Sequence, residues 1–198
     1  MEVFIDETGY NFHCQRIRGM SLIGTAAVQI VVTQKGINLS LIAAMTSDGV
    51  IHKNMKRGSI TKDDFQTFLI ELSTLLGEET KATFIFDNCR CHFAVESYYE
   101  AHSIERIPPY CPFLNAIEEL FSSLKRNIRI KLSTSLEHVA SLKGTEREKW
   151  LIDEVCGELE SISPEKCNQW VKHRKAFYPN CILMNNICLL YTSPSPRD

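Results

Sequence analysis

Apolar and polar residues follow one another along the chain in a pattern that predicts strands first and helices later. Residues 2–6 contain the apolar run Val3-Phe4-Ile5, which is typical of a buried strand. Residues 8–24 show little periodicity and are expected to form a loop or an irregular strand edge. Two β-rich runs follow at residues 26–33 and 37–45, separated by Gln34-Lys35-Gly36, a hairpin signal whose glycine permits positive φ.

The next stretch predicts a turn at residues 46–49 and a short edge strand at residues 50–53, which can pair back on its predecessor. Thr61 then opens a predicted helix that runs to about residue 76, because it can cap the helix and the acids after it suit the positive end. Apolar residues recur in that helix at helical spacing: Phe65, Phe68, Leu69, Leu72, Leu75 and Leu76.

A strand at residues 82–86, a helix at residues 95–102 and a strand at residues 104–107 form a predicted βαβ unit. Such units have parallel strands joined by a right-handed crossover. The proline-rich residues 108–112 exclude regular structure and predict a stiff loop, after which Asn115 precedes an amphipathic helix.

Only helical patterns follow, at residues 146–159 and from Ser163, where a capping serine precedes a proline. The pattern predicts an α/β domain over residues 1–132 and a helical C-terminal extension over residues 133–187. Four cations lie within seven residues of the helix after Asn115: Lys125, Arg126, Arg129 and Lys131. They indicate either a surface for a DNA backbone or a solvated helix face.

Composition limits the function classes. The 198 residues are 44% hydrophobic and 23% charged with a net charge of -2, which fits one or at most two compact domains. The near balance of charge excludes a global positive field that would hold DNA by phosphate neutralisation alone. Because the chain shows neither a bilayer-spanning apolar stretch nor a secretory signal, we expect a soluble, intracellular protein with no membrane partner.

Eight cysteines without an export signal are expected to be free thiols. Cys89, Cys91 and His92 lie close together in the sequence, but a C-x-C spacing does not favour a zinc knuckle. A small zinc module at these three residues is therefore a minor alternative.

Three carboxylates stand where they could share a site. Asp6 ends the first predicted strand, Asp87 ends the strand at residues 82–86, and Glu118 lies in the first turn of the helix after the proline loop. If the two strands are neighbours, the aspartates repel each other unless a cation such as Mg²⁺ or Mn²⁺ neutralises them. Each acid taken alone is equally consistent with a turn or cap, and Glu119 competes with Glu118 on spacing.

The sequences around these acids resemble the three signature blocks of the DDE/D transposases, most closely the Tc1/mariner and IS630-like group. The matching blocks are IDETG from Ile5, FDNCRCH from Phe86 and PPYCPFLNAIE from Pro108. The similarity runs over residues 3–131. The third block identifies Glu118, because in the family the invariant acid directly follows an Asn-Pro-Ile segment. The resemblance implies a ribonuclease-H-like fold with a mixed five-stranded sheet, three strands antiparallel and then two parallel, flanked by helices.

By the same resemblance, Asp6, Asp87 and Glu118 would bind two Mg²⁺ or Mn²⁺ ions and catalyse DNA cleavage and strand transfer. The resemblance implies that Asn88, His92 and Asn115 support the site formed by the three acids. A histidine hydrogen-bonded beneath the Asp87 loop is an equal alternative for His92. The implied partners are transposon-end DNA, target DNA and a second copy of the chain. The implied location is the nucleus in a eukaryote and the cytoplasm otherwise.

Some positions depart from the family pattern. Cys111, Phe113 and Ala116 replace a serine, an aspartate and a proline that the family usually carries there. None of the three is a metal ligand in the family, so catalysis is still expected. The alternative is a domesticated or inactive relic that binds DNA or protein partners without cutting.

Both ends suggest a longer parent protein. Family members carry a helix-turn-helix module that would precede Glu2, and without it sequence-specific DNA binding is not expected. Residues 188–198 resemble a translated sequencing adapter and are expected to be non-native.

Overall fold

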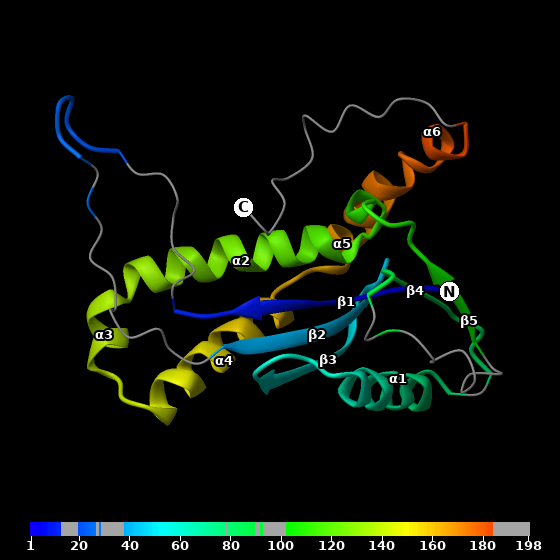
Figure 1. The fold of residues 1–198 in the computed structure, drawn as a ribbon, viewed down its shortest axis with the longest axis horizontal. Helices are drawn as coiled ribbons and strands as arrows, with labels where there is room; N and C mark the ends of the chain where they lie inside the picture. The colour runs from blue at the N-terminus through cyan, green and yellow to red at the C-terminus, as the bar shows by residue number, and fades with distance from the viewer. Residues whose placement is uncertain are drawn as a thin grey trace.

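The computed structural model describes residues 1–12, 20–26, 28, 38–77, 79–89, 92 and 102–183. Its centre is a five-stranded sheet with the order β3-β2-β1-β4-β5 (Figure 1). The strands are β1 (Glu2–Tyr10), β2 (Leu39–Thr46), β3 (Gly49–Arg57), β4 (Thr83–Phe86) and β5 (Ser103–Arg106). β2 pairs antiparallel with both β1 and β3, whereas β4 pairs parallel with β1 and β5. The mixed sheet with three antiparallel and two parallel strands is thereby confirmed.

Two strands are longer than their patterns predict. β1 continues through Tyr10, so the expected loop at residues 8–24 is wrong at its start. The reason is pairing: Thr8 lies opposite Leu41 and Tyr10 opposite Leu39, and Tyr10 is completely buried. β3 likewise runs on from residue 53 to Arg57, because its whole length pairs with β2. Most of the predicted strand at 26–33, the turn at 34–36 and the predicted helix at 95–102 lies outside the described residues.

The helices are α1 (Lys62–Leu76), α2 (Ile117–Thr134), α3 (Leu136–Ser141), α4 (Thr145–Glu160), α5 (Pro164–Lys175) and α6 (Tyr178–Ile182), with a 3₁₀ turn η3 (Pro112–Leu114). α1 begins at the predicted cap: Thr61 accepts from the backbone of Asp64, whose carboxylate accepts from the backbone of Thr61. Ser163 caps α5 in the same way, accepting from the backbone of Lys166. The helical C-terminal part of the chain is confirmed.

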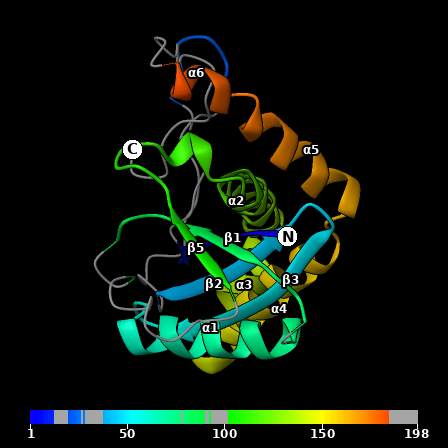
Figure 2. The ribbon, with the colours of Figure 1, turned by 90° about the vertical axis from the view of Figure 1, so that its right-hand side faces the viewer.

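Helices cover both faces of the sheet (Figures 1 and 2). α1 packs on one face, where Phe65 and Phe68 join Val3 and Ile5 in a buried cluster. α2 lies on the other face, whose cluster contains Phe4. Because successive side chains of a strand point to opposite faces, Asp6 follows Phe4 to the α2 face and Glu7 follows Ile5 to the α1 face. This alternation decides which helix each acid meets.

The C-terminal helices share the core on the α2 face. Leu151, Val155 and Leu159 of α4 and Val171 of α5 belong to the same buried cluster as Phe4. Figure 2 shows α5 crossing next to α2, which is seen end-on, on that side of the sheet. Within the described ranges, no helix is both long and apolar enough to cross a membrane.

Candidate active site

The three predicted acids line one cleft of about 710 Å³. β1 and β4 are parallel neighbours in which Phe4 lies level with Ile85, so Asp6 and Asp87 follow at the same height, two residues further on each chain. Glu118 reaches the cleft from the first turn of α2. The strands and the helix thus bring together acids that lie up to 112 positions apart in the sequence (118 − 6).

The charged form of Asp6 is disfavoured by its surroundings. Burial raises the pKa of its carboxyl well above the usual value, and the charges of Glu118, Glu7 and Asp87 raise this pKa further. The backbone N–H of Glu7 donates to Asp6 Oδ1 at 2.8 Å and opposes part of the effect. A carboxylate surrounded by like charges is stabilised by a cation.

Asn115 supports Asp6 from the turn before α2. Its Nδ2 donates to Asp6 Oδ2 at 3.2 Å and to the carbonyl of Ile5 at 3.5 Å. The side chain is only 1% exposed, and its Oδ1 is buried without a hydrogen-bond partner. Such an orphaned acceptor beside an acid cluster is suited to a bound cation or to the water around one.

His92 lies behind the acids, on the α1 face. Its Nε2 is 2.9 Å from Glu7 Oε1 and its Nδ1 is 2.8 Å from Asp87 Oδ1. The ring is fully buried and stacks on Phe65 with centroids 4.0 Å apart. Burial by itself lowers the pKa of His92, but the bonds to Asp87 and Glu7 outweigh it and raise this pKa to about 10. His92 therefore holds two carboxylates in place and has no open path to a phosphate.

Two contacts brace the ends of β4 and β5. Asn88 donates from Nδ2 to the carbonyl of Ile107 at 2.9 Å. Arg106 donates from Nη2 to the carbonyl of His92 at 2.9 Å, with its guanidinium 5.2 Å from the centre of the Phe86 ring. Sequence reasoning did not single out Glu7 or Arg106. Strand alternation next to Asp6 was the signal available for Glu7.

The two glutamates at the start of α2 have different surroundings. Glu118 lines the cleft. Glu119 turns to α5, where its Oε1 lies 2.8 Å from Arg174 Nη2 and 3.1 Å from His173 Nδ1. The tertiary structure thus separates two residues that spacing alone left equivalent.

The four cations of α2 differ in their surroundings, and Arg126 is exposed on the helix. Lys125 lines the cleft seven residues, two helical turns, after Glu118, and Arg129 continues the same stripe. Lys131 instead lies 2.6 Å from Glu154 and 2.9 Å from Glu158, both on α4. These two carboxylates engage the Lys131 ammonium in a contact between helices.

The acids of the cleft are not drawn together around a common point in this structure. Among the described residues, no three His, Cys, Asp or Glu side chains form a group ready to hold an ion. For the acids the physical reason is visible, since Asp87 and Glu7 are turned toward His92. For the zinc alternative, Cys89 is exposed, His92 is occupied by carboxylates, and Cys91 lies outside the described residues.

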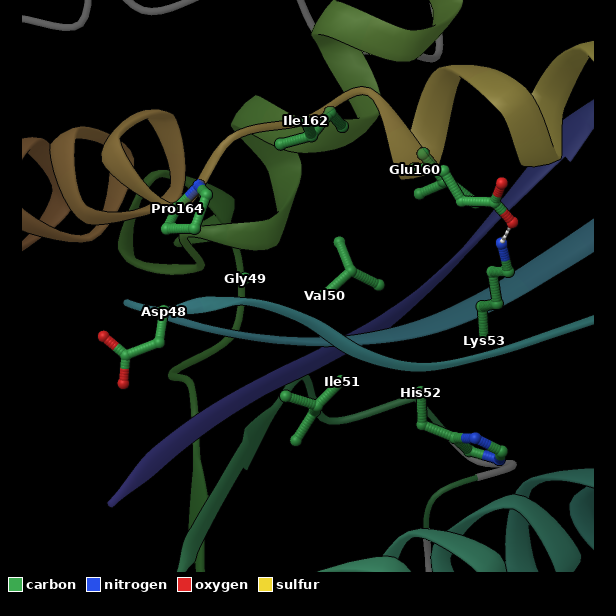
Figure 3. Close-up of a pocket in the computed structure, with 10 residues that line it drawn as sticks. Asp48, Gly49, Val50, Ile51, His52, Lys53, Glu160, Ile162 and Pro164 are labelled. Atoms are coloured by element: carbon green, nitrogen blue, oxygen red, sulfur yellow. Dashed lines mark hydrogen bonds and ion pairs between the residues drawn. The ribbon is translucent and has the colours of Figure 1, made fainter.

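A second cleft of about 400 Å³ lies between β3 and the connection from α4 to α5 (Figure 3). Val50 and Ile162 border it, and an ion pair of 2.9 Å between Lys53 and Glu160 spans one end (Figure 3). None of the three predicted acids lines this cleft.

The comparisons with known proteins agree with this geometry. The family described as DDE superfamily endonuclease matches residues 2–140. No curated protein matches the sequence. The chain is similar to the Mos1 transposase paired-end complex with left transposon end, with 18% identity and a TM-score of 0.70, covering 92% of this chain and 55% of that one.

Two further Mos1 structures are similar. The Mos1 mariner paired end complex with Mn has 19% identity and a TM-score of 0.69, covering 94% of this chain and 56% of that one. The Mos1 transposase catalytic domain with Raltegravir and Mg has 18% identity and a TM-score of 0.63, covering 94% and 84% respectively. These likenesses show the ribonuclease-H-like fold. The chain spans only 55% of the length of the first of these structures.

Proposed function

The chain belongs to the DDE superfamily of endonucleases, and from this premise we propose that it is the catalytic part of a Tc1/mariner transposase. The proposed activity is divalent-metal-dependent cleavage of DNA at the ends of a mobile element, followed by strand transfer into target DNA. The single observation that carries the proposal is the convergence of Asp6, Asp87 and Glu118 on one cleft of a fold shared with Mos1.

The chemistry of the cleft suits a hard divalent cation. The donors are carboxylate oxygens together with the orphaned amide oxygen of Asn115, a set that favours Mg²⁺ or Mn²⁺ over softer metals. We assign Asp6, Asp87 and Glu118 as the residues that would hold two such ions. Bound there, the metal would neutralise the carboxylates and stabilise the charge that develops on a phosphodiester. Mos1 has been solved with Mn and with Mg, which supports the assignment.

The chain's own residues have separate parts in this proposal. Asn115 orients Asp6 through its amide, and His92 holds the loop that carries Asp87. Lys125 and Arg129 run along α2 away from Glu118 and would follow a DNA backbone. The proposed partners are the DNA of the element's ends, target DNA and a second copy of the chain. The proposed location is the nucleus in a eukaryote and the cytoplasm otherwise.

Nicking of supercoiled plasmid DNA by the 198-residue chain tests the proposal. We expect nicking with Mn²⁺ and none with EDTA, and we expect Asp87→Asn to abolish it. The asparagine keeps an oxygen that can accept from the backbone of Cys89, so the loop should persist. Asp63→Asn, in the exposed first turn of α1, is the matched control and should nick like the wild type. Equal nicking by the wild type and Asp87→Asn would refute the assignment.

A second candidate is a relic that binds DNA without cutting it. It is favoured by the lack of a ready three-donor group among the described side chains and by Cys111, Phe113 and Ala116 at positions where the family usually has other residues. Thermal unfolding in increasing Mn²⁺ separates the two candidates. An intact acid cluster gains stability as it binds the ion. A relic that cannot bind metal shows no shift in its unfolding midpoint.

A further inference from the structure

A buried arginine reaches the candidate active site from outside the part of the chain that matches the family. Arg174 lies in α5, beyond residues 2–140, and is only 4% exposed. Its Nη1 donates to the carbonyl of Phe113 at 3.1 Å, and its Nη2 lies 2.8 Å from Glu119 Oε1. One guanidinium therefore joins the 3₁₀ turn η3 to the first turn of α2.

The segment between these two contacts carries the site. Asn115, which bonds to Asp6, and Glu118, which lines the cleft, both lie between Phe113 and Glu119. Arg174 contacts both ends of this seven-residue segment. The direction in which the Glu118 side chain projects from α2 therefore depends on the position of α5.

Burial of this guanidinium is difficult to explain as helix packing alone. Removing a charge from water costs several kcal/mol, and an apolar side chain of similar size often packs at least as well. Arg174 is in addition incompletely satisfied, since its Nε is buried without a partner. A planar donor fork that bonds two fixed acceptors specifies geometry, which an apolar contact would not do.

Neighbouring contacts hold the same end of α5 in place. Phe177 packs edge-on against Phe113, with ring centroids 5.7 Å apart. His173 shares Glu119 with Arg174. Lys175 Nζ lies 2.5 Å from Glu2 Oε2, at the start of the strand that carries Asp6. The end of α5 is thus joined both to β1 and to the turn before Glu118.

We propose that Arg174 is a positioning residue for Glu118, so that α5 helps to build the catalytic centre. The inference rests on the proposed function, because it takes Glu118 to be a ligand of the divalent ion. Arg174 acts through its contacts with Phe113 and Glu119, and its charge also attracts the carboxylate of Glu118.

Mn²⁺ affinity of the full chain, measured from the shift of the thermal unfolding midpoint or by titration calorimetry, tests the proposal. Loss of a residue that orients a metal ligand typically weakens the ion's affinity about 10- to 100-fold. We expect Arg174→Gln to weaken Mn²⁺ binding by about tenfold or more. Arg174→Lys keeps the charge without the fork and should fall between Arg174→Gln and the wild type. Glu119→Gln disturbs the same link from its other side and should act in the same direction.

A matched control separates positioning from general destabilisation. Leu159→Ala removes a buried side chain from α4, and Leu159 lines the second cleft and does not line the cleft of Asp6. It should lower the unfolding midpoint and leave the Mn²⁺ affinity unchanged. Lys172→Gln, at an exposed neighbour of Arg174, should change neither quantity.

The outcomes distinguish this inference from the proposed function. A wild-type chain that binds no Mn²⁺ overturns the proposed function and this inference with it. A wild type that binds Mn²⁺, combined with an unchanged affinity in Arg174→Gln, overturns this inference alone. If Arg174→Gln does not fold, Arg174→Lys and Glu119→Gln decide the question by the same measurement, and wild-type affinity in both overturns the inference.

Discussion

Asn115 donates from Nδ2 to Oδ2 of Asp6 across 3.2 Å, although 109 positions separate the two residues in the chain. The contact joins the middle of the central strand to the turn that precedes α2. It is partly buried, and it orients the acid whose pKa is raised by burial and by three neighbouring carboxylates. The residue that stabilises Asp6 therefore belongs to the same turn that sets the position of Glu118.

Replacing Asn115 with alanine should lower the free energy of unfolding by about 1–3 kcal/mol, because the change removes the donor to Asp6 and leaves a buried carboxylate less satisfied. Urea unfolding followed by circular dichroism measures the change. Asn54→Ala, at an exposed position of β3, is the control and should stay within about 0.5 kcal/mol of the wild type. Equal stability of the two variants would contradict the role given to Asn115.

Asp64→Asn should destabilise the protein at neutral pH by about 1 kcal/mol and lose its effect in acid. Hydrogen bonds from Lys56 and Thr61 lower the pKa of Asp64 to about 2. A lowered folded-state pKa stabilises the fold above the unfolded value, near 3.9, and this contribution disappears as the pH falls through about 2. Urea unfolding of both proteins between pH 7 and pH 2 should show the two stabilities converging. A difference that stays constant, or that grows in acid, would contradict the interpretation.

Lys125→Met should affect DNA binding, whereas Lys131→Met should affect the stability of the fold. Lys125 lines the cleft, so its loss should weaken DNA binding and reduce the slope of log K against log salt by about 0.9. Lys131 contacts Glu154 and Glu158, so its loss should lower stability by about 0.5–1 kcal/mol and leave that slope unchanged. Fluorescence anisotropy with a labelled duplex at several salt concentrations, together with thermal unfolding, compares them. A reduced salt slope in Lys131→Met would show that Lys131 contacts DNA as well.

Tyr110 should be replaceable by asparagine with a gain in stability. Its φ of 62° lies in the left-handed region, although its side chain is 98% exposed. Asparagine tolerates this backbone conformation better than tyrosine, so Tyr110→Asn should raise the free energy of unfolding by about 0.5–1 kcal/mol. Tyr110→Val should lower it, since β-branched residues are poorly accommodated at positive φ. Urea unfolding of the three proteins tests the order, and a valine variant as stable as the asparagine variant would refute the backbone argument.

Much of the fold could be predicted from local pattern because the relevant signals are local. Thr61 and Ser163 cap helices with their own side chains, and helical spacing of apolar residues found α1, α2 and α4. The end of β1 could not be predicted in this way. Residues up to Tyr10 are held in a strand by pairing with β2, which lies about thirty positions further along the chain.

The candidate site likewise has features that adjacent residues identify and features that only tertiary contacts decide. The residue types around Asp6, Asp87 and Glu118 identified the family resemblance, because each signature block is a run of consecutive residues. The tertiary structure decided which neighbours these acids have. Strand alternation directs Glu7 to His92, and the packing of α5 gives Glu119 to Arg174 and leaves Glu118 to the cleft. Hydrogen bonds and charges act through space, so contacts between residues far apart in the sequence exist only once the chain has folded.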